Sequence, residues 1–179
     1  MYPRRMIREP TSLRRATLDD CADLAEIHAQ AWTLAYQGVL QGVELRRLIA
    51  RRTDAWWQGA LRRGVEIMVL DVLGKPAGYA TFGSCRLSDF PQAGEIYELY
   101  MRPDHQGLGF GRSLFAAVRK DLAARGRPTL AVQVLGQNSA ARGFYQAIGG
   151  TLAATSTYRS AGQTLDLAIY TWPPLSTRA

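Results

Sequence analysis

A glycine-rich turn between a predicted strand and a predicted helix is the segment whose residues point most directly to chemistry. It reads Gln106-Gly-Leu-Gly-Phe-Gly-Arg112. A strand that ends in such a turn and enters a helix presents unpaired backbone N–H groups and the positive end of the helix dipole, which together bind phosphate. Glycine is needed there because a Cβ would keep the ligand away from the backbone. The residue types alone therefore predict a phosphate-binding loop.

Two common phosphate loops do not account for this segment. A Walker loop ends in Gly-Lys-Ser/Thr, whereas Gly111 is followed by Arg112 and Ser113. A dinucleotide fingerprint needs G-x-G-x-x-G near the start of the fold, whereas the glycines from Gly107 onward are spaced G-x-G-x-G and follow earlier strands.

The elements that must position this loop alternate in an α/β order. Apolar residues at every second position indicate the strands, and apolar residues with a period of 3.6 indicate the helices. Gly, Pro and Asn mark the boundaries of these elements. Strands are predicted at about 12–16, 65–73, 76–84, 95–101, 129–135, 151–159 and 164–172. Helices are predicted at about 17–38, at 43–63 with a break near 51–53, at 112–125, and from Asn138 to 148. Gly74-Lys75 is expected to turn the first hairpin.

Length and composition indicate one globular domain. The chain has 179 residues, with no apolar run long enough to span a bilayer and no secretory signal at its start. We expect a flexible basic extension at 1–10, a single domain at 11–173 and a tail at 174–179. The two cysteines and two histidines lack metal-ligand spacing, so no metal and a reducing cytoplasm are expected.

The net charge is 22 − 15 = +7, which concentrates any polyanionic ligand, nucleic acid included. The arginine pairs at 46–47, 51–52 and 62–63 are not interleaved with aromatic residues as on a base-stacking surface. Most of them are expected on solvated helix faces.

Two motifs give the chain a family resemblance. Gln106 to Gly111 matches the Q/R-x-x-G-x-G/A hallmark of the GNAT N-acetyltransferase superfamily, and Leu99-Tyr-Met-Arg-Pro103 resembles the strand end that precedes it there. Asn138, Ala141, Phe144 and Tyr145 match the second motif, N-x-x-A-x-x-F-Y. The resemblance spans roughly residues 12–172 and implies the acyl-CoA N-acyltransferase fold, a mixed α/β sheet in the order β-α-α-β-β-β-α-β-α-β-β.

The resemblance implies a site for acetyl-coenzyme A. In this family the loop amides hold the pyrophosphate, the strand end pairs with the pantetheine arm like an added strand, and the second motif lies near the thioester. The implied cofactor-binding residues are Leu99, Tyr100, Met101, Gln106, Gly107, Leu108, Gly109, Phe110, Gly111, Arg112, Asn138, Arg142 and Tyr145, the two arginines as partners of the outer phosphates.

The resemblance also implies direct attack of an amine on the thioester, with Tyr145 as the acid for the departing thiolate. Glu95 precedes Gln106 by 106 − 95 = 11 residues. This spacing resembles that of the glutamate that acts as base in the histone-acetyltransferase branch, and Glu98 is the next candidate for the base. They are three positions apart, so strand alternation puts them on opposite faces unless a bulge intervenes. The alternative interpretation of each glutamate is a carboxylate that forms an ion pair with an arginine on the sheet surface. A chain of water molecules could also act as the base in place of both. Gln133 stands where some relatives have a glutamate, and it is no base.

The first predicted helix supplies candidate acceptor-binding residues. His28, Trp32 and Tyr36 recur at i, i+4 and i+8 in one stripe, a pattern similar to small bacterial GNAT enzymes in which this region faces the substrate. A packed core stripe is the alternative. A departure from the family pattern is Gly150, where an aromatic residue is usual.

The sequence thus predicts an acetyl-CoA-dependent N-acetyltransferase acting on a primary amine of a small molecule or peptide. The alternatives are a non-catalytic acyl-CoA-binding module of the same fold and a basic nucleic-acid-binding domain. A homodimer is possible in principle, because final strands in this fold often pair between subunits. The acceptor itself is not encoded in any motif.

Overall fold

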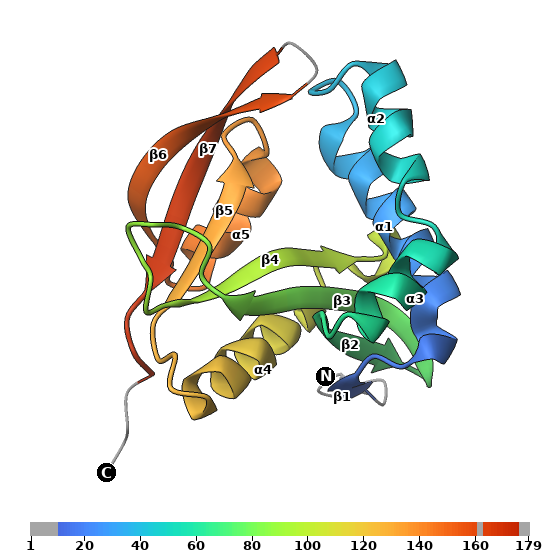
Figure 1. The fold of residues 1–179 in the computed structure, drawn as a ribbon, viewed down its shortest axis with the longest axis horizontal. Helices are drawn as coiled ribbons and strands as arrows, with labels where there is room; N and C mark the ends of the chain where they lie inside the picture. Colours follow the sequence, from blue (N-terminus) through green and yellow to red (C-terminus); the bar gives the residue numbers. More distant parts are fainter. Residues whose placement is uncertain (1–10, 161–162, 176–179) are drawn as a thin grey trace, which may run out of the picture.

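The computed structural model describes residues 11–160 and 163–175. The predicted N-terminal extension and most of the predicted tail lie outside these ranges. Seven strands form one sheet in the order β1-β2-β3-β4-β5-β7-β6 (Figure 1). The strands are β1 Thr11–Arg15, β2 Glu66–Val72, β3 Lys75–Ser84, β4 Gly94–Met101, β5 Leu130–Leu135, β6 Thr151–Ser160 and β7 Gln163–Trp172. The helices are α1 Cys21–Tyr36, α2 Gly42–Ala50, α3 Asp54–Arg62, α4 Phe110–Ala124 and α5 Ser139–Ala147, with short 3-10 turns η1 Leu18–Asp20 and η2 Pro103–His105.

The predicted order of elements is confirmed, with two refinements. The second predicted helical region is two helices, because α3 starts anew at Thr53, whose side chain accepts a hydrogen bond from the Trp56 N–H. The turn of the first hairpin is Leu73-Gly74, one residue earlier than expected, since both residues have positive φ and Val72 pairs with Lys75. Such a two-residue turn matches the twist of the flanking strands.

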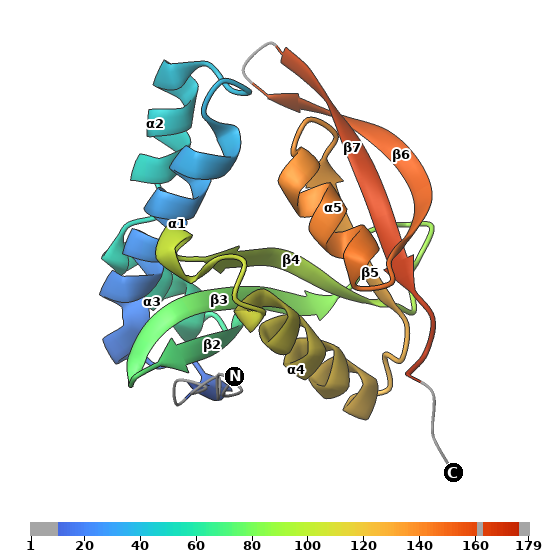
Figure 2. The same cartoon turned by 180° about the vertical axis from the view of Figure 1, so that it is seen from behind.

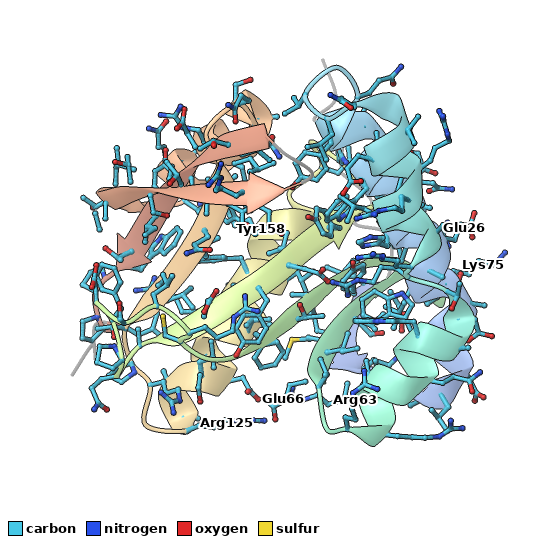
Figure 3. All side chains as sticks on the ribbon, turned by 45° about the horizontal axis from the view of Figure 1, so that its top comes forward. Glu26, Arg63, Glu66, Lys75, Arg125 and Tyr158 are labelled. Carbon is cyan, nitrogen blue, oxygen red and sulfur yellow. The ribbon has the colours of Figure 1, made fainter. Side chains whose placement is uncertain are left out.

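Helices cover both faces of the sheet. Leu114, Val118 and Leu122 of α4 pack with apolar side chains of β2, β3, β4, β5 and β7 on one face, together with α5. On the other face, α1 and α3 pack against β2 and β3 through residues such as Leu24 and Trp57. Arg125, directly after α4, forms an ion pair with Glu66 of β2 and so ties the helix to the sheet (Figure 3). No helix among the described residues is long and apolar enough to cross a bilayer.

The sheet opens in the middle. β4 and β5 are its one parallel pair among the described strands, and they pair only between Gly94–Ile96 and Leu130–Val132. Beyond that point the two strands diverge (Figures 1 and 2), while β4 stays paired with β3 as far as Met101. The last residues of β4 therefore turn unpaired backbone groups toward the gap, where an extended ligand could pair with them.

The unusual glycine of this chain, Gly150, has a packing reason. A Cβ there would lie 2.5 Å from Trp172 and 2.8 Å from the Tyr145 carbonyl oxygen. Trp172 donates a hydrogen bond to the Ile148 carbonyl over 3.1 Å and so already occupies this space. A large side chain at position 150 would have no room.

Candidate functional site

A cavity of about 630 Å³ lies where β4 and β5 diverge. The end of β4, the glycine-rich loop, α5 and one face of α1 line it. The structure brings most of the predicted cofactor residues together here: Leu99, Tyr100, Met101, Gln106, Gly107, Gly109, Gly111, Arg112, Asn138 and Tyr145. A cavity of this size, lined by apolar walls and a few polar groups, is typical of a small-molecule site.

The glycine-rich loop has the backbone that its sequence predicts. Gly107 and Gly109 have φ of 75° and 86°, and Gly109 is the N-cap residue directly before α4. A Cβ on either glycine would meet no atom within 4 Å, so the space in front of the loop is open. Among the described residues, no acceptor is found for the N–H groups of Gly107, Leu108 and Gly109. Together with the first N–H groups of α4, these form an anion-binding concavity.

Gln106 holds the loop to the sheet. Its side-chain amide donates a hydrogen bond to the Met101 carbonyl over 3.2 Å. This contact explains in physical terms why the loop starts with a residue that has a long polar side chain. His105, which the sequence analysis did not single out, also lines the cavity and contacts the Asp104 carboxylate at 2.8 Å. No motif marks His105.

Three predicted cofactor residues do not line the cavity. Leu108 is 62% exposed and is not among the residues that line it. Phe110 packs against the apolar core beside α4. Arg142 donates to the Gly136 carbonyl over 3.1 Å and to the Tyr170 hydroxyl over 3.3 Å, so its guanidinium is used within the protein. Arg112, in contrast, lies at the rim of the cavity and donates to the Ala147 carbonyl.

Tyr145 and Asn138 reach the cavity from α5. Tyr145 is 6% exposed, and its ring packs against those of Phe144 and Trp172. Burial raises the pKa of its hydroxyl above the ordinary value, which keeps it protonated and able to donate. The Asn138 side chain accepts a hydrogen bond from the Ala141 N–H over 3.0 Å and thereby caps α5. The predicted helix start is confirmed.

A β-bulge changes the expected placement of the two glutamates. Thr81 pairs with Glu98, but the next residue of β3, Phe82, pairs with Ile96, so Tyr97 is an extra residue in β4. The extra residue cancels the alternation between positions 95 and 98. Both carboxylates therefore lie on the face that carries α1 and α3, which is the exception that the sequence analysis allowed for a bulge.

Glu95 is occupied by contacts within the protein. It is 1% exposed, and its carboxylate accepts from the Arg86 N–H at 2.7 Å and from the Arg86 guanidinium at 2.9 Å. The Arg86 guanidinium in turn stacks over the Tyr97 ring at 3.8 Å. This arrangement is the arginine-paired alternative foreseen for a carboxylate on this strand.

Glu98 is also paired with an arginine, but it accepts a further hydrogen bond from a tyrosine. Its carboxylate accepts from Arg52 Nη2 at 2.8 Å and from the Tyr79 hydroxyl at 3.3 Å. Burial raises the pKa of this carboxyl, and the Arg52 charge and the Tyr79 hydrogen bond oppose that rise. A carboxylate whose pKa lies above the usual range is a stronger base than an ordinary one.

Arg52 and Tyr79 were not predicted as site residues. Arg52, which the sequence analysis placed on a solvated helix face, lies between α2 and α3 with its guanidinium 3.8 Å from the centre of the Trp56 ring. The Arg52–Glu98 contact spans 46 positions, so no local pattern could reveal it. The neighbouring Trp56-Trp57 pair is the one signal in the sequence, since tryptophan faces attract arginine.

The predicted acceptor stripe on α1 is an aromatic cluster. Trp32 packs between His28 and Tyr36, with ring centroids 4.9 and 4.8 Å away. The Tyr36 hydroxyl lies 3.3 Å from the Tyr100 hydroxyl, and hydrogen bonding with Asn138 also acts on it. The stripe therefore contacts Tyr100 and Asn138, which line the cavity, while His28, Trp32 and Tyr36 do not line it themselves. His28 is only 1% exposed.

Among residues 11–160 and 163–175, no group of three or more His, Cys, Asp or Glu side chains is placed to hold a metal ion. The cavity thus combines a phosphate-binding loop, an open strand edge and a protonated tyrosine, while the Glu98 carboxylate is not part of its lining.

Sequence comparisons find relatives over most of the chain. A family model described as FR47-like protein matches residues 88–160. YuaI, an uncharacterised N-acetyltransferase of Bacillus subtilis (strain 168), is 30% identical over 165 residues, which cover 92% of this chain and 94% of YuaI. MnaT, an L-amino acid N-acyltransferase of Escherichia coli (strain K12), is 31% identical over 145 residues, which cover 80% of this chain and 81% of MnaT.

A structural comparison agrees with the sequence matches. The structure of yncA from Salmonella typhimurium, determined with its cofactor acetyl-CoA, has a TM-score of 0.66 and 26% identity to this chain. The match covers 94% of this chain and 96% of that structure.

Proposed function

The chain belongs to the GNAT superfamily of N-acetyltransferases, and from this premise we propose that it transfers the acetyl group of acetyl-CoA directly to a primary amine of a small molecule or peptide. The observation that carries the proposal is the cavity between β4 and β5, which joins an anion-binding loop to an open strand edge and a buried tyrosine. The alternative of a non-catalytic module is set aside with the family assignment.

The donor side of the cavity suits coenzyme A. The unpaired N–H groups from Gly107 to Gly109 and the start of α4 would bind the pyrophosphate. The backbone of Leu99 to Met101, free on its β5 side, would pair with the amides of the pantetheine arm. Arg112, at the rim, would add a positive charge for the phosphates.

The chemical step needs a base for the amine. An alkylamine with a pKa of about 10.4 is almost wholly protonated at pH 7, so its deprotonation costs roughly 4–5 kcal/mol. We assign this role to Glu98 rather than Glu95. The Glu98 carboxyl has a raised pKa, whereas both oxygens of Glu95 bind Arg86.

The departing thiolate needs a proton, and Tyr145 is the group we assign to donate it. Tyr145 lines the cavity, and its hydroxyl stays protonated because burial raises its pKa. As the amine nitrogen bonds to the carbonyl carbon, the carbon–sulfur bond breaks and the Tyr145 proton moves to sulfur. Glu98 takes the proton that the nitrogen loses and releases it to solvent, from which Tyr145 recovers its own proton.

The charges on the acceptor side favour an acceptor that is not a polycation. Glu95 and Glu98 are each paired with an arginine, so the acceptor side offers no surplus negative charge to a polyamine or an aminoglycoside. A small zwitterion such as an L-amino acid fits a balanced site better. That MnaT is an L-amino acid N-acyltransferase supports the same substrate class.

The test is release of free thiol from acetyl-CoA in the presence of single L-amino acids, with the matching N-acetylated amino acids as controls that lack the amine. We expect release only with a free amine, and little with polyamines. If no amine accelerates release, the proposed activity is wrong. If polyamines are the better acceptors, the substrate class is wrong but the activity stands.

A further inference from the structure

A chain of hydrogen bonds links His28, a member of the acceptor stripe, through Tyr79 to Glu98. His28 Nδ1 lies 3.0 Å from the Tyr79 hydroxyl, and this hydroxyl lies 3.3 Å from Glu98 Oε2. His28 is 1% exposed and Tyr79 fully buried, so the His28–Tyr79 contact is buried, whereas the Tyr79–Glu98 contact is partly buried. The three residues come from α1, β3 and β4.

The direction of each hydrogen bond follows from counting protons. An ionised carboxylate only accepts, so the single proton of the Tyr79 hydroxyl points to Glu98. The Tyr79 oxygen must then accept from His28, which means that the His28 proton is on Nδ1. Burial, and to a lesser extent the Arg52 charge, lowers the pKa of His28 to about 3, so the imidazole is neutral with a single N–H.

In this tautomer His28 Nε2 carries no hydrogen and has a lone pair that can only accept a hydrogen bond. Nε2 is buried and, within the described residues, has no hydrogen-bond partner. An arrangement in which the proton sat on Nε2 would leave a buried donor without an acceptor and would turn the Tyr79 proton away from Glu98. The Nδ1 tautomer is favoured because it satisfies both contacts that the geometry shows.

We infer that His28 and Tyr79 are positioning residues for the chemical step: His28 fixes the Tyr79 hydroxyl, and this hydroxyl holds the Glu98 carboxylate as a proton acceptor for the attacking amine. The inference rests on the proposed function, in which Glu98 is the base. It assigns a purpose to a histidine that is too buried to touch the acceptor and to a tyrosine that no motif identifies.

Other charged and polar groups also act on Glu98. Arg52 approaches from the α2–α3 junction and Arg86 from the segment after β3, and both positive charges favour its ionised form. Thr81 of β3 donates to it as well, and the hydroxyls of Tyr36 and Tyr100 lie within electrostatic range. The Tyr79 hydrogen bond can be removed without changing any charge.

The experiment is the pH profile of kcat/KM for Tyr79→Phe, which keeps the ring and deletes the hydroxyl. Loss of one hydrogen bond to an ionised carboxylate raises its pKa by about one unit. The acidic limb of the profile should therefore move to higher pH by about one unit, while KM for acetyl-CoA stays unchanged. Tyr97→Phe is the matched control, since it deletes a hydroxyl on the same sheet that donates to the Ser84 carbonyl and not to Glu98.

Two substitutions of His28 test whether it fixes the Tyr79 hydroxyl. Asn places an N–H where Nδ1 lies, so His28→Asn should keep the acidic limb in place. His28→Leu offers no donor and should move the limb in the same direction as Tyr79→Phe. Thermal unfolding of each variant reports whether it folds, and the limb position does not depend on how much enzyme is folded.

The outcomes separate this inference from the proposed function. If Tyr79→Phe lowers the rate equally at all pH values, Tyr79 is merely structural and the inference is overturned. If Glu98→Gln keeps the wild-type rate and pH profile, Glu98 is not the base. The positioning role of His28 and Tyr79 is then wrong as well, while the proposed acetyl transfer is not contradicted. A shifted limb in Tyr79→Phe and His28→Leu, with Tyr97→Phe and His28→Asn as wild type, supports the inference.

Discussion

Replacing Gly109 with alanine tests the anion-binding loop, and the structure supplies a matched control. Gly109 has φ of 86°, and a Cβ there would meet no protein atom within 4 Å. Gly126, just beyond the other end of α4, has φ of 79° and equally open surroundings. Each substitution should cost folding about 1–2 kcal/mol, because an L side chain is strained in the left-handed region.

The two variants should differ in cofactor binding. At Gly109 the new methyl group lies where a pyrophosphate must approach the loop amides, and the loss of even one hydrogen bond to a charged group costs about 1.5–3 kcal/mol. Since 1.4 kcal/mol is a factor of ten, Kd for acetyl-CoA should rise roughly 10- to 150-fold in Gly109→Ala. Gly126→Ala should bind as wild type does.

The assay is isothermal titration with acetyl-CoA, with thermal unfolding alongside to compare the two folding penalties. The reasoning is refuted if Gly109→Ala is destabilised as much as Gly126→Ala and still binds with wild-type affinity. Equal losses of affinity in both variants would show instead that a strained glycine weakens binding through the fold, whatever its place.

Three more substitutions test the rest of the site. Tyr145→Phe should slow the chemical step by about 10²-fold in single-turnover measurements while acetyl-CoA affinity stays nearly unchanged, and unchanged turnover would remove Tyr145 from the mechanism. Asn138→Ala should lower the free energy of unfolding by about 1 kcal/mol in denaturant titrations, because α5 loses its cap, and a smaller effect than 0.3 kcal/mol would contradict the cap. Arg52→Gln should raise the pKa of Glu98 further and destabilise the fold by roughly 1–3 kcal/mol at neutral pH, less than a fully buried pair because Arg52 is partly exposed. Since the folded-state pKa of this carboxyl would lie above its unfolded value, the loss should shrink as the pH falls through that pKa, and urea titrations at several pH values would show it.

Local sequence patterns predicted the elements that carry the site. Asn138 was placed correctly at the start of α5 because a side-chain cap acts over three residues. The loop at Gly107 and Gly109 was predicted because positive φ and close ligand approach both require glycine. Interactions between residues only a few positions apart can therefore be predicted from the local sequence.

Contacts between distant segments were not predictable. The bulge at Tyr97 depends on how β3 and β4 align, and it alone decides that Glu95 and Glu98 share a face. Arg52 looks like any surface arginine until the fold brings it over Trp56 and against Glu98. Arg142, expected near the phosphates, is instead bound to a carbonyl and a hydroxyl that lie close only in the folded chain.

The central claim is that acetyl passes directly from acetyl-CoA to an amine, and the most direct measurement follows the acetyl group itself. Acetyl-CoA labelled with ¹³C in the acetyl group is mixed with the protein and an L-amino acid, and mass spectrometry is applied to both the acceptor and the intact protein. The account predicts label on the acceptor nitrogen in equal amount to the free thiol released, and none on the protein. Label held on the protein, or thiol release without labelled acceptor, would contradict it.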